Sequence, residues 1–174
     1  EVLDLLFVDD TADLVEEMPA NVAKRVLKHT DIATRKMINE ILKYPEDSAG
    51  SIMTTEFVSL KKDMTVLDAL NKIKATGVDK ETIYTCYVTD NTKKLIGLVS
   101  TKDILLSDMD KYIEDIMETN IIYTHTLADQ EDVVKMFDKY DLLAIPVVDK
   151  EDRLIGIITV DDAIDVIREE NTED

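Results

Sequence analysis

The side chains in this sequence that could do chemistry are mainly carboxylates. The chain of 174 residues carries 38 Asp and Glu against 20 Lys and Arg, which gives a formal net charge of −18. Such an excess destabilises a compact fold by self-repulsion, which cations, acid or a basic partner can relieve. Nucleic acid is excluded as an expected partner, because phosphate binding requires clustered Lys and Arg.

Acids fall at helical spacing in two places. Asp9 and Asp13 lie four residues apart, which puts two like charges on one helix face at a cost of about 0.2 to 0.5 kcal/mol. On the last predicted helix, Asp162, Asp165 and Glu169 form a stripe at positions i, i+3 and i+7. The stripe is predicted to lie opposite an apolar face that consists of Ala163, Val166 and Ile167.

Other acids have an ordinary structural interpretation beside a ligand-binding one. Asp129 and Glu131 stand where the first turn of a helix usually carries acids, and spacing favours an N-cap for Asp129. Asp141 could simply be the residue that ends a helix. An acidic stripe is usually explained as the face of a helix that solvent covers. Three more acids lie at the end of the last helix, where the dipole disfavours them and a compensating positive group is expected: Glu170, Glu173 and Asp174.

A polar motif, Gly-x-x-Ser/Thr-x-x-Asp, occurs twice where a predicted strand meets a predicted helix. The first copy contains Ser100 and Asp103, and the second contains Thr159 and Asp162. In each copy the hydroxyl can cap the helix, and the acid three residues later interacts favourably with the helix dipole.

The elements around the two motifs repeat in the same order, and this internal duplication determines the fold more than any single motif does. It predicts an α+β fold of two β-α-β-β-α modules. The first module is predicted from residues 58–60, 65–73, 84–89, 94–100 and 101–106, with a turn at 91–92. In the second, residues 121–123 match 57–59, and the later elements are 129–140, 144–148, 154–159 and 160–170, with a turn at 149–153.

The residues before the repeat are predicted to be all-helical. Thr11 could cap a short helix that stops at Pro19, and two further apolar stripes end at Tyr44-Pro45. Helices this short are marginal alone and stack as small layers. The first stretch is acidic, so we do not expect it to be a signal peptide, and because the first residue is Glu1 we interpret the chain as part of a longer protein.

Several classes of protein are disfavoured by what the sequence contains. No apolar run approaches the roughly 20 residues that a membrane span requires. Cys86 is the single cysteine, which fits a reducing, cytoplasmic setting. His29 and His125 lack metal-ligand spacing, and no Gly-rich phosphate loop is present. We therefore expect a regulatory binding protein and not an enzyme.

The repeated motif resembles that of a CBS domain pair, and further segments resemble the MgtE family of magnesium transporters. The resemblance implies a C-terminal part of a superhelical N domain at 1–51, a first CBS domain at 52–114, and a second CBS domain with the start of a connecting helix at 115–174. The segments that carry it are 44–50 (YPEDSAG), 52–54 (IMT), 81–84 (ETIY), 129–131 (DQE), 139–141 (KYD) and 159–174.

The family resemblance implies that the acids bind magnesium between these parts. Mg²⁺ demands octahedral oxygen ligands and gives up its waters reluctantly, so one or two carboxylates from each of two facing surfaces can hold a hydrated ion. It also implies a homodimer through the CBS domains, at the cytoplasmic face of the membrane, continuous with a membrane channel domain absent from this chain. The implied ligands are Asp9, Asp13, Asp129, Glu131, Asp141, Asp162, Asp165, Glu170, Glu173 and Asp174.

The main rival is a sensor of an adenine nucleotide, since CBS pairs commonly bind AMP or ATP in their central cleft. Ser100, Asp103, Thr159 and Asp162 would then contact the ribose. An aromatic residue that could stack on adenine is not obvious, although Tyr84 and Tyr87 are candidates. Magnesium and nucleotide could also bind together.

Overall fold

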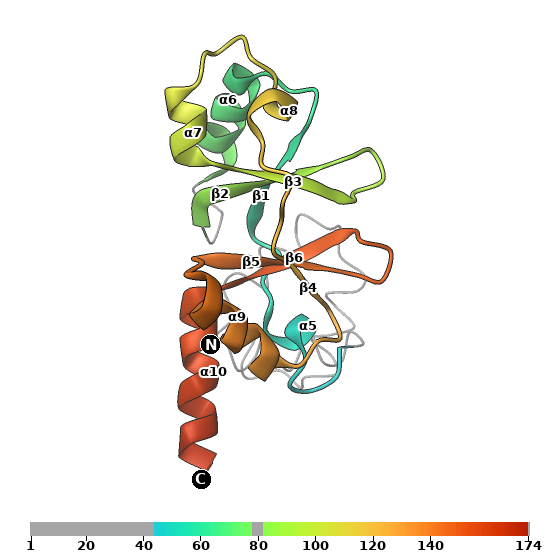
Figure 1. The fold of residues 1–174 in the computed structure, drawn as a ribbon, viewed down its shortest axis with the longest axis vertical. Helices are drawn as coiled ribbons and strands as arrows, with labels where there is room; N and C mark the ends of the chain where they lie inside the picture. Colours follow the sequence, from blue (N-terminus) through green and yellow to red (C-terminus); the bar gives the residue numbers. More distant parts are fainter. Residues whose placement is uncertain (1–43, 78–81, 174) are drawn as a thin grey trace, which may run out of the picture.

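A computed structural model describes residues 44–77 and 82–173 of the chain. The helices predicted before Tyr44 lie outside the described residues. The described part consists of two modules, each with a three-stranded sheet and covering helices, stacked along the long axis of the molecule (Figure 1). Within these ranges no helix is both long and apolar enough to cross a bilayer.

The first module has the sheet order β1-β2-β3, in which β1 pairs parallel with β2 and β2 pairs antiparallel with β3. Thr65 begins α6 with a capping box, because its side chain accepts from the Asp68 backbone N–H and the Asp68 side chain accepts from the Thr65 N–H. The elements are β1 Phe57–Lys61, α6 Val66–Thr76, β2 Thr82–Thr89, β3 Leu95–Ser100, α7 Thr101–Leu106 and α8 Ile113–Ile116.

The second module repeats this topology and its register. Leu60 pairs with Val88 and Val88 with Gly97, just as Thr124 pairs with Val147 and Val147 with Gly156. The predicted duplication is therefore confirmed residue by residue. The elements are β4 Thr124–His125, α9 Gln130–Tyr140, β5 Ala144–Val148, β6 Leu154–Thr159 and α10 Val160–Glu173, while α5 Ala49–Ile52 precedes the first module.

The strand β4 is shorter than its equivalent β1. Residues 121–123 keep the predicted match to 57–59 but lie outside the strand. The reason is the length of the neighbouring strand: β2 begins three positions earlier than β5 and gives Phe57 a partner in Thr82. The second sheet has no such extension to pair with Ile121, and the residue opposite Tyr123 in this register is Pro146, which has no N–H to donate.

Each module is completed by a segment that precedes the other one. Ala49, Ile52 and Met53, which precede the first module, are buried in the core of the second. Ile113, Ile116 and Met117 pack in the core of the first. The predicted domain boundaries at 51/52 and 114/115 thus fall inside α5 and α8, the two exchanged segments.

Two glycines make this exchange possible. Thr54 and Ile157 exchange backbone hydrogen bonds of 2.8 and 2.9 Å, and Leu98 and Glu118 exchange an equivalent pair of 2.9 and 2.8 Å. A Cβ added to Gly156 would lie 2.7 Å from the Thr54 carbonyl oxygen, and one added to Gly97 would lie 2.6 Å from the Met117 sulfur. The sheets also meet through an apolar cluster of Phe57, Tyr87, Leu154 and Ile157.

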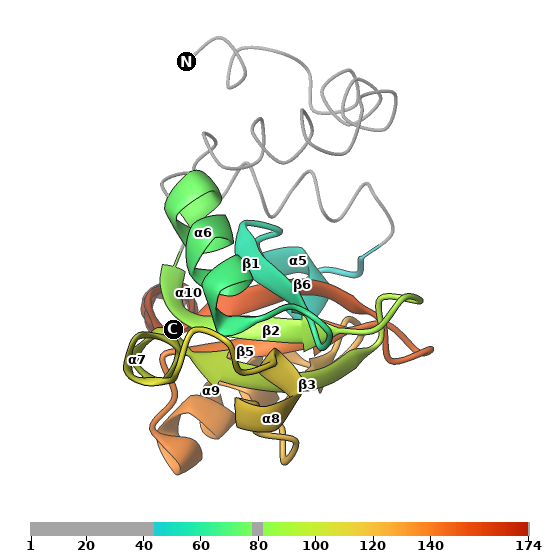
Figure 2. The ribbon, with the colours of Figure 1, turned by 90° about the horizontal axis from the view of Figure 1, so that it is seen from above.

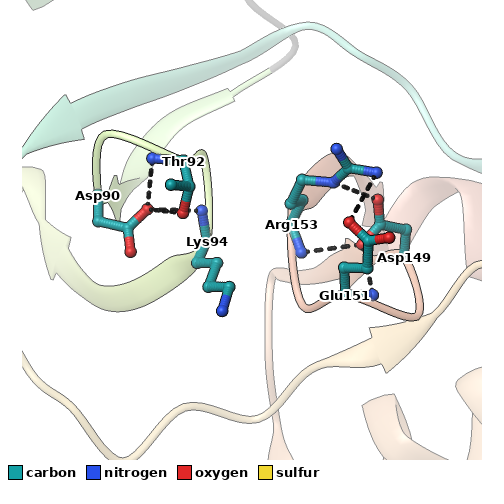
Figure 3. Close-up of polar contacts among 6 residues, drawn as sticks. All are labelled: Asp90, Thr92, Lys94, Asp149, Glu151 and Arg153. Carbon is teal, nitrogen blue, oxygen red and sulfur yellow. Dashed lines mark hydrogen bonds and ion pairs between the residues drawn. The ribbon is translucent and has the colours of Figure 1, made fainter.

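The hairpin turns repeat down to single hydrogen bonds (Figure 3). Asp90 Oδ1 accepts from the backbone N–H groups of Thr92 and Lys94 at 2.8 and 3.0 Å. Asp149 Oδ1 accepts from those of Glu151 and Arg153 at the same two distances. Both turns project from the same side of the molecule in two perpendicular views (Figures 1 and 2).

The carboxyl groups in both turns ionise more readily than usual. The hydroxyl of Thr92, which donates to Asp90 Oδ1 at 2.7 Å, is the largest cause of the lowered pKa of Asp90. Burial by itself would raise the pKa of Asp149, but hydrogen bonds from the Arg153 and Glu151 N–H groups outweigh it and lower that pKa. Each turn therefore contributes stability above the ordinary Asp pKa of about 3.9, and this contribution is lost as the pH falls towards the folded value.

The exchanged segments predict unequal effects of two alanine substitutions. We expect Gly156→Ala to lower the free energy of unfolding by about 1 to 3 kcal/mol, because a hydrogen-bonded backbone carbonyl must move. Gly97→Ala should cost less, since its nearest neighbour is the flexible Met117 side chain. Urea denaturation measures both; equal costs, or none at Gly156, would contradict the exchange as the constraint.

The hairpins predict a titration change. Thr92→Ala removes the hydroxyl donor, so the pKa of Asp90 should rise towards about 3.9, whereas Thr92→Ser should leave it low. Carboxyl-carbon NMR titration of the two variants and the parent chain measures this. An Asp90 midpoint that is the same in all three proteins would show that the hydroxyl bond is absent in solution.

Candidate functional site

Two predicted ligands cap the helix α9. The Asp129 side chain accepts from the Glu131 backbone N–H at 2.8 Å, which confirms the predicted N-cap. Asp141 ends the helix in the left-handed conformation, with φ 54° and ψ 43°. The 11 residues of α9 span about 16 Å, so a single ion cannot contact both ends. If both groups bind metal, they belong to separate sites.

The start of α10 lies beside the end of α9. The Val160 N–H donates to the Leu143 carbonyl at 2.9 Å, and the two helices then pack against each other. Asp162 and Asp165 therefore occupy the same end of the helix layer as Asp141. Asp165 is half-buried, with one carboxylate oxygen 4.0 Å from Arg168 Nη1.

The predicted stripe on α10 is wrong in one respect. Asp162 is only 4% exposed and lies on the same buried face as Ala163 and Val166, whereas Ile167 is 41% exposed. The helix packs its first turn against the end of β6 and against α9, and this contact covers Asp162 and leaves Ile167 outside. Among the residues of α10 whose side chains are described, the solvent-facing acids are thus Asp161 and Glu169, with Asp165 at the border.

The remaining predicted ligands cannot be placed by their side chains. Asp9, Asp13 and Asp174 lie outside the described residues, and Glu170 and Glu173 are placed only as backbone of α10. Within 44–77 and 82–173, no three His, Cys, Asp or Glu side chains already form a cluster that could hold a metal ion. The described carboxylates fit the outer ligands of a hydrated ion better than a closed cage.

The repeated motif acts as a helix cap in both modules. Ser100 Oγ accepts from the Asp103 N–H at 3.0 Å, and Thr159 Oγ1 accepts from the Asp162 N–H at 3.2 Å. The copies differ in their acids, because Asp103 is exposed whereas Asp162 is buried. Capping and ligand contact remain compatible for these hydroxyls, each of which carries two lone pairs.

A cleft of about 220 Å³ lies between the two sheets, next to the end of α9. Tyr87 lines it but is only 1% exposed, and it packs edge-on against Phe57 with ring centroids 6.1 Å apart, so it cannot stack on a ligand. Tyr84 is 67% exposed. The cleft is lined by Thr85, Tyr87, Leu98, Glu118, Asn120, Ile122, Asp141, Leu142, Leu143, Ala144 and Pro146.

The single cysteine and the described histidine differ in their surroundings. Cys86 is fully buried, and burial raises the pKa of its thiol to about 11, so a nucleophilic thiolate is suppressed at neutral pH. His125 is exposed and packs edge-on against Tyr123. His29 lies outside the described residues.

Comparisons with known proteins match this chain along most of its length. The CBS domain profile matches residues 49–110 and 113–169, and the profile of the MgtE intracellular N domain matches residues 1–47. The magnesium transporter MgtE of Thermus thermophilus is 39% identical over 171 residues, which cover 96% of this chain and 38% of that protein. Its Bacillus subtilis counterpart is 39% identical over 95% of this chain and 37% of that protein. The chain thus spans well under half the length of these relatives.

Solved structures give the same result. The soluble part of a magnesium transporter is 39% identical and superposes with a TM-score of 0.74, covering 97% of this chain and 66% of that one. The cytosolic domain of the Mg²⁺ channel MgtE in complex with ATP is 36% identical, with a TM-score of 0.72 over 95% of this chain and 68% of that one.

Proposed function

The chain is a CBS-domain protein of the MgtE family, and we propose that it is the magnesium-sensing regulatory region of a magnesium transporter. The proposal rests on one observation above all: Asp141 ends α9 and Asp162 and Asp165 lie in the first turns of α10, at the same end of the helix layer, in a chain of net charge −18. Mg²⁺ with its waters suits such a set, because each carboxylate can bind through water or directly.

The negative charge at this end of the layer supports a cation there. Asp141, Asp162 and Asp165 are three carboxylates at one end of the layer, and like charges that share a region disfavour each other's ionised form. A divalent ion would lower this repulsion. The ligands would be completed from facing surfaces by the other proposed acids, Asp9, Asp13, Asp129, Glu131, Glu170, Glu173 and Asp174.

In the proposed mechanism, magnesium acts by bridging surfaces. At low magnesium the facing carboxylates repel each other, since monovalent salt screens charges only beyond about 8 Å. At high magnesium the ions join the N domain, the CBS pair and the connecting helix, and the closed state is favoured by its higher affinity for ions. The membrane channel domain, which would lie beyond this chain, responds to that closure at the cytoplasmic face of the membrane.

A homodimer through the CBS domains completes the proposal. Apolar side chains on and after α7 are exposed, with Leu106 at 75%, Leu105 at 57% and Met109 at 38%. On the second module Leu143 is 57% exposed and Ile164 and Ile167 are 41% exposed. Association of two copies would remove this apolar surface from water.

An adenine nucleotide is the second candidate ligand, and the cleft between the sheets is the observation that favours it. A related cytosolic domain, 36% identical, was solved in complex with ATP. Here the cleft offers the aliphatic side chains of Ile122, Leu142 and Leu143 to a base, while Tyr87 presents a buried hydroxyl without a hydrogen-bond partner among the described residues. AMP or ATP would bind without aromatic stacking and could occupy the protein together with magnesium.

Magnesium should compact the chain and protect it from proteolysis, whereas potassium chloride at equal ionic strength should not. Asp141→Asn should raise the magnesium concentration needed for protection several-fold, because it removes one charge from the proposed site. Asp138 is also an exposed acid, lies in α9 and is outside the proposed set, so Asp138→Asn is the matched control. Equal protection by both salts, or equal effects of the two variants, would reduce the effect to general screening.

Calorimetry with ATP, with and without magnesium, tests the second candidate. Leu142→Glu places a negative charge in the cleft and should weaken ATP binding by about tenfold or more, since like charges strongly disfavour association. Leu127→Glu, on a residue 70% exposed and outside the cleft, should leave it unchanged. If the parent chain gives no heat with ATP in either buffer, the nucleotide candidate fails.

A further inference from the structure

A second and larger cavity, of about 500 Å³, lies beside the hairpin turns and shares no lining residue with the cleft. Its charged lining is mostly basic, although the chain as a whole is strongly acidic. Among the described residues, four cationic side chains line it, Lys61, Lys72, Lys93 and Arg153, against one carboxylate, Asp149. Apolar side chains of Phe57, Val58, Leu154 and Ile155 complete part of the wall.

One wall carries ammonium and hydroxyl groups in a fixed arrangement. Lys61 Nζ donates to Thr89 Oγ1 at 3.0 Å and to the Asp90 carbonyl at 2.9 Å. Ser59 Oγ lies 3.5 Å from the same Thr89 hydroxyl, and Lys72 Nζ donates to the Ser59 carbonyl. The acceptors of Lys61 are neutral, so its positive charge is held in place without being cancelled by them.

The opposite wall comes from the hairpin turns, and backbone bonds fix their relative position. The Leu154 N–H donates to the Lys93 carbonyl at 2.9 Å, and the Leu95 N–H donates to the Asp152 carbonyl at 3.1 Å. Arg153 Nε pairs with Asp149 at 2.8 Å and its Nη2 pairs with Glu151 at 3.3 Å, which orients the guanidinium (Figure 3). The planar fork has five N–H donors, so Arg153 keeps donors for an anion besides these two pairs.

The duplication supplies an internal control for this composition. A smaller cavity of about 290 Å³ occupies the equivalent place on the other side of the hairpins. There Tyr123 replaces Ser59, Val148 replaces Thr89 and Asp152 replaces Lys93, as the matching strand registers require. Lys93 and Asp152 share the same left-handed backbone, with φ 68° and 65°. The basic and hydroxyl-rich lining is therefore not a by-product of the CBS fold.

We propose that the larger cavity binds a phosphate-bearing small anion. Ammonium, guanidinium and hydroxyl donors that converge on one space form the donor set that phosphate oxygens accept from. The cavity volume suits a small molecule, and the apolar wall suits an organic part attached to the phosphate. A bound anion would contact β1 and β2 of one module and the β5–β6 turn of the other, and so would hold the pair together.

Pyrophosphate is the probe, titrated into the whole chain by calorimetry with a chelator present, so that magnesium plays no part. Saturable binding is expected, and Lys93→Glu on the exposed turn should weaken it by about tenfold or more, because it reverses a charge at the cavity. Lys94→Glu is the matched control, since the neighbouring side chain lines the smaller cavity instead and should leave binding nearly unchanged. Leu142→Glu, in the cleft, should also have no effect.

Three results would overturn the proposal. They are the absence of saturable pyrophosphate binding, equal weakening by Lys93→Glu and Lys94→Glu, and loss of binding through Leu142→Glu, which would move the anion to the cleft. Since magnesium and ATP are absent throughout, these outcomes are independent of whether the chain senses magnesium. Melting temperature gives a second readout. Pyrophosphate should raise it in the parent chain, and Thr89→Val, which removes the buried hydroxyl, should abolish this rise.

Discussion

The exchange of α5 and α8 between the two modules is the constraint on which the rest of the structure depends. Two residues after each segment, Thr54 and Glu118 each exchange two backbone hydrogen bonds with an edge strand of the module that the segment does not precede, at Ile157 of β6 and Leu98 of β3. Neither module has a complete core without the other, because Ile52 and Met53 fill one and Ile113 fills the other. The pair therefore behaves as one folding unit, and ligand contacts in one module can be felt in both.

This coupling gives the acids and the cavities their positions. The second sheet sets the end of β6 beside the end of α9, and this places Asp141 and the buried Asp162 at the same end of the helix layer. The same stacking aligns the two hairpins, so that Lys93 and Arg153 meet at one cavity of positive charge. Opposite electrostatic environments thus arise at different edges of one rigid scaffold, and a cation and an anion could bind without competing.

Sequence patterns predicted the repeat and its register, because the same order of residue types occurs twice. They also predicted the helix caps at Ser100, Thr159 and Asp129, because a cap depends on neighbours within a few residues. The exchange could not be predicted, since a hydrophobic segment such as Ile52-Met53 does not specify which of two similar cores it enters. The burial of Asp162 was missed for a related reason: helical periodicity locates a face, but packing against α9 decides which face is covered. The basic cavity could not be predicted, because it combines residues from β1, α6 and both turns, which are far apart in the sequence. Only the shared spacing of Asp90 to Lys94 and of Asp149 to Arg153 was visible in the sequence.

The central claim is that carboxylates at the helix layer bind magnesium, and diffraction tests it most directly. Crystals of the chain soaked in magnesium, and in manganese for its anomalous signal, should be compared with crystals grown with chelator. We expect an ion close to Asp141 and Asp162, and a further ion at least the length of α9 away, near Asp129 and Glu131. Metal-soaked crystals without ion density at any of these carboxylates would contradict the proposal.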